Sequence, residues 1–420
     1  MRICAGRCLV ASVLLCAAWQ ARAQVGNPFA PDQSSAEPHE SSSGSADKPS
    51  QPPPLTIPVE PLGFSAPGPI YLGERFSFVS LDFLDENRLL FTFRVPGLLR
   101  RDAGDDAESE ERHIRAVVLT LPAGRVEAEA LWTLHDRARY LWMLKDGHFL
   151  LRDRDGLQQG DASLELKPLL QFPGPLLWLE PDPSGQFLVT NSQEPAAATA
   201  KPTTQGDLVV RILRRETGQV MLVSRSRAAA YLPINAEGYL ESQRGNGMEW
   251  TLKMNYFSGG SSVMGRVDSA CPPTYDFVSE REVLVTPCGP GGRCKLVAMA
   301  ANGRRLWEDP ASAAAVWPLV VRAPDGSRLA RETLAVSHSV DAYSPIDMEE
   351  IKGQMIEIFN AADGKVALQT QASPMLDAGG NVAISPSGRR VAVLNAGAIQ
   401  VFDLTAPPPL PQDLGSQSTH

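Results

Sequence analysis

The chain has 420 residues, of which 43% are hydrophobic and 21% are charged, and its formal net charge is −9. This composition supplies a large buried core and excludes a wholly disordered chain. An acidic surface repels nucleic acid and anionic lipid, so neither is expected as a partner. No run of eighteen apolar residues follows the N-terminal segment, which predicts that the chain has no membrane span.

The N-terminal residues have the pattern of a secretory signal. Arg2 and Arg7 precede an apolar run over Leu9–Ala18, and Ala21-Arg22-Ala23 has the small-x-small form of a cleavage site. We therefore predict a Sec-type signal peptide over residues 1–23, cleaved after Ala23, and export to the periplasm or the extracellular space. Cleavage removes three arginines and no acidic residue, so the formal charge falls from −9 to −12.

Lipidation of Cys16 is the alternative at this end of the chain. A lipoprotein signal requires a small residue directly before the cysteine, whereas Leu15 is large. The sequence therefore favours cleavage after Ala23 without a lipid anchor.

The segment 24–69 is rich in Pro, Ser, Ala and Glu and poor in aliphatic residues. It cannot bury enough apolar surface to offset the entropy of ordering, which predicts a disordered tether. Residues 405–420 are predicted to form a disordered tail, so the folded domain is expected over residues 70–404.

The first three repeat units follow in order, and each begins with two β-strand patterns around a polar turn. Their first strands and turns lie in the stretches 76–95, 140–152 and 176–190. The second has Asp146-Gly147 and the third has Asp182-Pro-Ser-Gly185, which are typical hairpin turns.

The next three units are less uniform. Strands of the fourth are expected at 231–235, 239–243 and 249–256, followed by a Gly/Ser loop at 258–262. The fifth and sixth units cover residues 274–307 and 317–371, and an insertion near 338–352 interrupts the sixth.

The last unit, Gly379–Leu404, is the clearest copy, because three short strand patterns are separated by the turns Ser385-Pro-Ser-Gly388 and Asn395-Ala-Gly397. The first turns of all units recur near residues 86, 146, 184, 237, 280, 325 and 387, about 50 residues apart, within the blade length of propeller repeats. The prediction is an all-β fold, a single β-propeller with seven four-stranded blades, although six or eight blades stay open.

The last unit offers three strands before the proline-rich stretch 405–411, so its blade would have an open edge. We expect an N-terminal strand, supplied by residues 68–75, to complete this blade and close the ring.

The hairpin turns at Asp182-Pro-Ser-Gly185, Pro324-Asp-Gly326 and Ser385-Pro-Ser-Gly388 resemble those of the WD40-like and quinoprotein-like propeller repeats of exported bacterial proteins. The stretch Asn302–Trp307 looks like the end of a quinone-cofactor blade. The chain departs from true WD40 blades in lacking repeated Gly-His and Trp-Asp pairs. The resemblance therefore implies a fold rather than an activity.

Three cysteines remain after the signal. Cys288 and Cys294 lie at opposite ends of a Gly/Pro turn, where cross-strand partners come within disulfide reach, so we predict this bond. A bond from Cys271 to either of them is the alternative. No His or acidic residue accompanies the three cysteines at a zinc-like spacing, so no metal site is expected.

Catalytic motifs are absent from the sequence, which has no nucleophile elbow, phosphate loop, haem site or His-Glu-x-x-His helix. We therefore predict no catalytic, cofactor-binding or metal-binding residue, and we interpret the tryptophans as core. The favoured function is a monomeric, non-catalytic exported scaffold that binds a protein or small ligand through one face or its central channel. The alternative is a quinone-type oxidoreductase or a hydrolase with its active site at the channel mouth.

Overall fold

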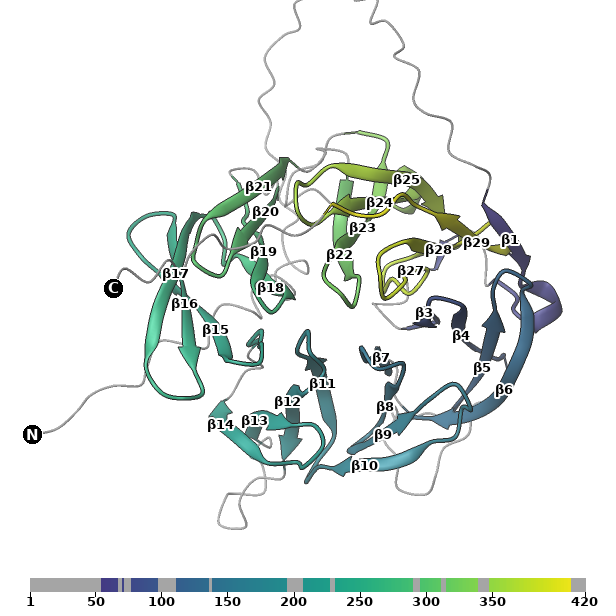
Figure 1. Cartoon of the computed structure of the whole chain (residues 1–420), viewed down its shortest axis with the longest axis horizontal. Coiled ribbons are helices and arrows are strands. Elements are labelled where there is room, and N and C mark those ends of the chain that lie inside the picture. The colour runs from purple at the N-terminus through teal and green to yellow at the C-terminus, as the bar shows by residue number, and fades with distance from the viewer. Residues whose placement is uncertain are drawn as a thin grey trace, which may run out of the picture.

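The computed structural model describes residues 54–66, 70–71, 77–96, 111–135, 138–194, 207–226, 231–289, 295–310, 315–338 and 347–408. Over these residues the chain forms a ring of seven antiparallel sheets, each with its first strand nearest the axis (Figure 1). The predicted seven-bladed β-propeller is thereby confirmed. The predicted signal peptide, with Cys16, lies outside the described residues.

Within each blade, the strands are ordered from the axis outward. The first three blades consist of β3 Val79–Asp85, β4 Arg88–Arg94, β5 Arg112–Thr120 and β6 Arg125–Leu134; β7 Leu141–Met143, β8 Phe149–Asp153, β9 Gly156–Gly160 and β10 Lys167–Gln171; and β11 Leu176–Pro181, β12 Phe187–Glu194, β13 Asp207–Arg214 and β14 Val220–Ser226. Blades 4 and 5 consist of β15 Gly238–Arg244, β16 Glu249–Tyr256 and β17 Ser261–Asp268; and β18 Thr274–Ser279, β19 Glu282–Thr286, β20 Lys295–Ala300 and β21 Arg305–Pro310. Blades 6 and 7 consist of β22 Ala315–Arg322, β23 Arg328–Val336, β24 Ile351–Asn360 and β25 Val366–Ala372; and β27 Val382–Ile384, β28 Arg390–Asn395, β29 Ala398–Asp403 and β1 Leu55–Pro58.

Blade 4 has three regular strands and an innermost segment of looser pairing. Ile234 bridges Tyr239, and Leu240 donates a backbone hydrogen bond to Pro233 at 2.9 Å, so the segment 231–235 takes the innermost position. The loop predicted at 258–262 is shorter than expected, because β17 already begins at Ser261. Gly259 and Gly260 form this turn with positive φ angles, which favour glycine.

An N-terminal strand completes blade 7, but the predicted segment is wrong. Strand β1 pairs antiparallel with β29, with Ile57 opposite Ile399, so residues 55–58 rather than 68–75 close the ring. Instead, β2, Ile70–Tyr71, pairs in parallel with β26, Met375–Leu376. The apolar alternation of β1 is only four residues long and lies between prolines, which explains why its composition resembles that of a linker.

The segment after β1 is also part of the core. The short 3₁₀ helix η2, Glu60–Leu62, ends at Gly63 in the left-handed conformation, and Phe64 is buried beyond it. Its ring lies 5.4 Å from Phe93 and 5.5 Å from Phe91, both in edge-to-face geometry. The boundary predicted near residue 69 is therefore too late, because order begins before the end of the expected tether.

The core consists of apolar clusters between neighbouring blades rather than one central core. One cluster joins blades 7 and 1, and another joins blades 4 and 5. Tryptophans fill several of these contacts, as predicted; Trp132, Trp142, Trp250 and Trp307 are all buried.

The structure contains a disulfide between Cys271 and Cys288, which lie 17 residues apart. The bond ties the segment before β18 to the segment just after β19 in blade 5. This is the pairing that the sequence left as the alternative; Cys294, the partner predicted first, lies outside the described residues.

Candidate functional site

Charged and titratable side chains meet at the axis of the ring. We call six of them the axial cluster: Asp82 on β3, Arg139 before β7, Glu180 on β11, Tyr231 in the inner segment of blade 4, Asp276 on β18 and Arg322 at the end of β22. They come from blades 1 to 6, and Figure 1 shows the strands that carry four of them, β3, β11, β18 and β22, around the middle of the ring. Sequence patterns did not single out any of these residues.

Arg322 lies at the centre of this cluster. Its Nη2 is 4.0 Å from Glu180 Oε1 in blade 3, and its Nη1 is 3.7 Å from Asp276 Oδ1 in blade 5. The same guanidinium donates to two backbone carbonyls, Pro181 O at 3.0 Å and Phe277 O. Since blades 3 and 6 are not neighbours in the ring, this side chain crosses the axis.

Arg139 adds a second cation. Its Nη1 is 3.6 Å from Glu180 Oε2, and its Nε donates to Leu141 O at 3.1 Å, so Glu180 lies between two guanidinium groups. Burial raises the pKa of Asp82, and the positive charge of Arg139 offsets part of this rise. The charges therefore alternate along the cluster, from Asp82 through Arg139, Glu180 and Arg322 to Asp276.

Asp276 lies in protein surroundings that water still reaches. Its side chain is 46% exposed. Partial loss of solvation nevertheless raises the pKa of Asp276 to about 6. The positive charge of Arg322 lowers this pKa, and the negative charge of Glu180 raises it. Tyr231 donates a hydrogen bond to Asp276 and packs edge-on against Trp178, with ring centroids 4.9 Å apart. Burial and these acidic neighbours raise the pKa of Tyr231 well above its usual value, so it stays a neutral donor.

Asp82 has a similar environment on the opposite side of the ring. Burial raises its pKa to about 6, against a lowering by the hydroxyl of Ser80, which donates to Asp82 Oδ2 at 2.6 Å. Behind it, the buried Tyr140 hydroxyl lies 2.8 Å from the Thr92 hydroxyl. Burial therefore raises the pKa of both aspartates to about 6, above that of an ordinary carboxyl.

This arrangement is suited to binding a charged group. Arg139 keeps 60% of its side chain exposed, so the cluster is open to solvent as well as internally paired. Three carboxylates face two guanidinium groups at neutral pH, which leaves an excess of negative charge at the axis. Each carboxylate is held by a hydrogen bond or ion pair, and such preorganisation lowers the cost of binding.

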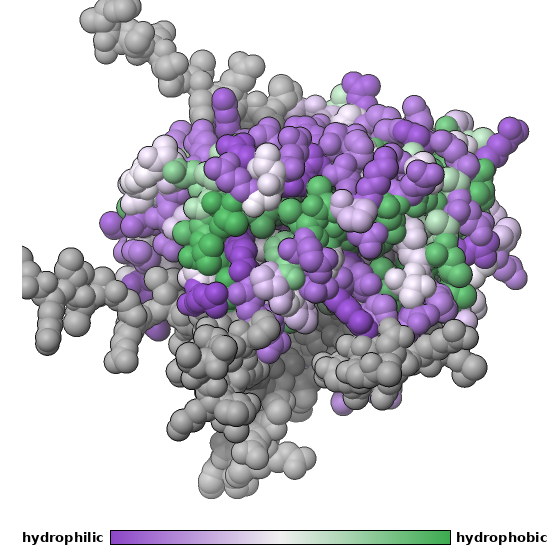
Figure 2. Space-filling view, turned by 90° about the horizontal axis from the view of Figure 1, so that it is seen from below, coloured by the Kyte–Doolittle hydropathy of each residue, from purple (hydrophilic) through white to green (hydrophobic). Residues whose placement is uncertain are grey.

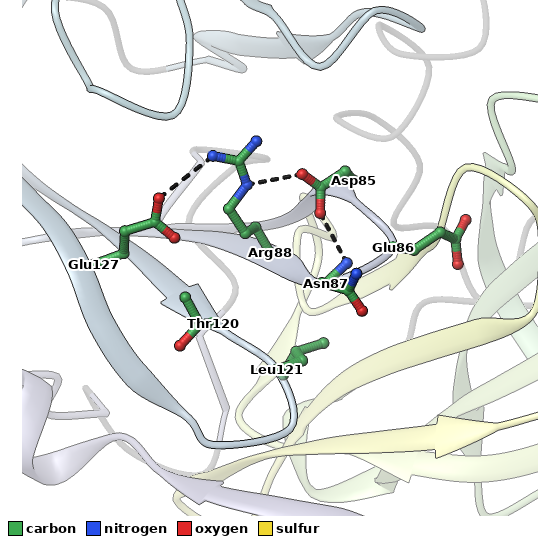
Figure 3. A pocket seen from close by; sticks show the side chains of 7 residues that line it. All are labelled: Asp85, Glu86, Asn87, Arg88, Thr120, Leu121 and Glu127. Atoms are coloured by element: carbon green, nitrogen blue, oxygen red, sulfur yellow. Dashed lines mark hydrogen bonds and ion pairs between the residues drawn. The ribbon is translucent and has the colours of Figure 1, made fainter.

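A shallow pocket on one face of blade 1 is a weaker candidate. It is lined by Asp85, Glu86, Asn87, Arg88, Thr120, Leu121 and Glu127 (Figure 3). Arg88 lies between Asp85 at 2.7 Å and Glu127 at 3.4 Å, and Glu86 accepts a hydrogen bond from Ser387 N at 2.6 Å. These charged groups already stabilise the turn and its contact with blade 7, so the pocket offers little free binding capacity.

The outer rim is apolar in places. Figure 2 shows a hydrophobic band between polar margins on the side of the ring seen from below. On the outermost strand β14, Val220 and Val223 are 45% and 52% exposed. These two valines offer apolar contact area, whereas the axial cluster has both charge and directed hydrogen bonds.

Metal and membrane sites are not indicated. In the part of the chain that the structure describes, no three His, Cys, Asp or Glu side chains gather as they would around a metal ion. None of the described helices has the length and apolar character that crossing a membrane requires.

Comparison with known proteins gives structural likeness only. No family model and no curated protein sequence matches the chain. Among solved structures, it is similar to the WD40 domain of coronin from Toxoplasma gondii, at 9% identity and a TM-score of 0.43, over 84% of this chain and 85% of that chain. It is also similar to a eukaryotic initiation factor, at 14% identity and a TM-score of 0.35, over 69% of this chain and 79% of that chain.

Proposed function

We propose that the protein is an exported, monomeric β-propeller that acts as a binding scaffold for a protein or small ligand, and that the axial cluster is its binding surface. The observation that carries this proposal is the meeting of charged side chains from separate blades at an axis that solvent reaches. A purely structural ion pair needs neither this exposure nor partners from blades on opposite sides of the ring. Binding residues on a rigid scaffold are positioned in this way.

The test compares two double variants in affinity capture from the exported fraction. Glu180→Gln/Asp276→Asn removes two axial charges with little change of shape, whereas Glu165→Gln/Glu216→Gln removes two charges from exposed positions on the rim. We expect the rim variant to retain the partner of the wild-type protein and the axial variant to lose at least about tenfold in affinity, or about 1.4 kcal/mol. Equal retention by both variants would place binding elsewhere on the molecule.

Export is part of this proposal and rests on the N-terminal sequence pattern. Mass spectrometry of the N-terminal peptide of the mature protein should give a start at Gln24. A start at a modified Cys16 would instead identify a lipoprotein.

A hydrolase is the second candidate, because the pKa of about 6 at Asp82 and Asp276 lies closer to neutral pH than that of an ordinary carboxyl. In that case, the axial double variant would lose turnover of a captured small ligand while still binding it.

A further inference from the structure

Glu332 is a buried acid outside the axial cluster. It lies on β23 with 1% of its surface exposed, and its strand neighbours on either side, Leu319 of β22 and Ile356 of β24, are apolar. Gln354 Nε2 donates to its Oε2 at 3.2 Å. A side chain at Gly379 would approach both carboxyl oxygens within 3.4 Å, so the loop before β27 also covers the carboxyl group.

Gln354 links Glu332 to strand β26. Its Oε1 accepts hydrogen bonds from Leu376 N at 2.9 Å and from Asn381 Nδ2 at 2.7 Å, and its Nε2 also donates to Leu376 O at 3.1 Å. These contacts fix the orientation of the amide, because a flipped Gln354 would direct its NH₂ at two donors. Glu332 Oε2 must therefore be an acceptor.

Two oxygen atoms at this site lack a hydrogen-bond partner among the described residues, namely Glu332 Oε1 and Asn381 Oδ1. Both residues are at most 1% exposed. An ionised carboxylate in this position would be a buried charge without a cation beside it, which is strongly unfavourable. A proton on Glu332 removes the charge and turns one carboxyl oxygen into an O–H hydrogen-bond donor. In agreement, burial raises the pKa of Glu332 to about 8.

We propose that Glu332 is a neutral acid at neutral pH and forms, with Gln354 and Asn381, a pH-sensitive latch that holds strand β26 in the ring. Leu376 of β26 pairs in parallel with Tyr71 of β2, so the latch also holds strand β2 in place. The groups beside the carboxyl on other elements are neutral: Leu319 of β22, Gln354 of β24 and the backbone at Gly379. Deprotonation of Glu332 would therefore place an unpaired charge beside Gln354 and weaken the contact between Gln354 and strand β26.

The direction of the pH effect follows from linkage. The pKa of Glu332 is 4.5 in an unfolded chain and about 8 in the folded protein, so the folded state binds the additional proton between these values. The contribution of Glu332 to stability is fully present below pH 4.5 and is lost as the pH rises towards 8. Glu332→Gln is neutral throughout and lacks this dependence.

The experiment measures hydrogen exchange of peptides that cover residues 373–381, at pH 7 and pH 9, after correction for the intrinsic exchange rate. We expect protection in the full-length wild-type protein to fall about tenfold between these pH values and to change less than twofold in Glu332→Gln. Glu349→Gln, at an exposed position before β24, is the matched control and should behave as wild type. Parallel behaviour of wild type and Glu332→Gln would overturn the proposal.

A second measurement does not depend on the variant's folding. Infrared spectra of wild-type protein with ¹³C-carboxyl glutamate should show a protonated carboxyl band at pH 7.5 that disappears by pH 9. Most of this band should come from Glu332, because Glu282, with a pKa of about 7, is already largely ionised at pH 7.5. Absence of this band at pH 7.5 would show that Glu332 is ionised there, and the latch would be excluded.

Discussion

At the scale of the residue, Arg322 combines a structural and an electrostatic role. Its guanidinium donates to the carbonyls of Pro181 and Phe277 and at the same time approaches Glu180 and Asp276. A lysine could not make all these contacts, because it lacks the planar fork of donors. The position therefore requires arginine for geometry as much as for charge.

The pairing of the cysteines is a residue-scale prediction that a peptide map decides. Trypsin cleavage after Arg266, Arg281 and Arg293 separates the three cysteines into peptides 267–281, 282–293 and 294–295. Because the structure joins Cys271 to Cys288, we expect non-reducing mass spectrometry to find the first two peptides linked. Linkage of peptide 282–293 to 294–295 would instead support the pairing of Cys288 with Cys294.

At the scale of the element, the sequence correctly predicted where each hairpin lies. The turns at Gly185, Gly326 and Gly388 all have positive φ, and the polar residues before them hydrogen-bond within the turn; Asp182 Oδ1, for example, accepts from Phe187 N at 2.7 Å. These signals are local, which makes them readable without a structure. Strand β1 has no such signal, because its partner β29 lies more than 300 residues away in the chain.

The segment after β1 should contribute strongly to stability. Phe64 is 5% exposed and contacts three other phenylalanine rings, so Phe64→Ala should lower the free energy of unfolding by about 3–5 kcal/mol. Urea denaturation followed by tryptophan fluorescence measures this change. Thr56→Ala, at an exposed position of β1, is the control and should cost less than about 0.5 kcal/mol. A loss below about 1 kcal/mol for Phe64→Ala would mean that this segment does not fasten the ring.

At the scale of the whole molecule, the axial cluster exists only because the ring closes. In the sequence its members are separated by tens of residues and match no catalytic motif. One regularity becomes visible once the first hairpins of the blades are aligned. Each of four axial residues lies seven positions before the first apolar residue of the second strand in its own blade. These pairs are Asp82 and Leu89, Glu180 and Phe187, Asp276 and Val283, and Arg322 and Leu329.

That regularity could have been found from the sequence, but its meaning could not. The aligned position is apolar in blades 2 and 7, with Trp142 and Ile384, so the pattern alone does not show that the charged residues approach one another. Their contact depends on the blade number and on the curvature of the ring. Long side chains such as Arg322 then reach a blade that is not a neighbour.

A double-mutant cycle tests this coupling across the ring. Glu180→Gln, Arg322→Gln and the combined variant are unfolded in urea, and the coupling energy is the departure of the combined change from the sum of the single changes. Because both side chains are only about one-fifth exposed and their charged atoms lie 4.0 Å apart, we expect a favourable coupling of about 1 kcal/mol. The control cycle pairs Arg322→Gln with Glu165→Gln at the exposed rim and should give less than about 0.3 kcal/mol. If both cycles gave the same small value, blades 3 and 6 would be energetically independent, and the charges at the axis would not form one binding surface.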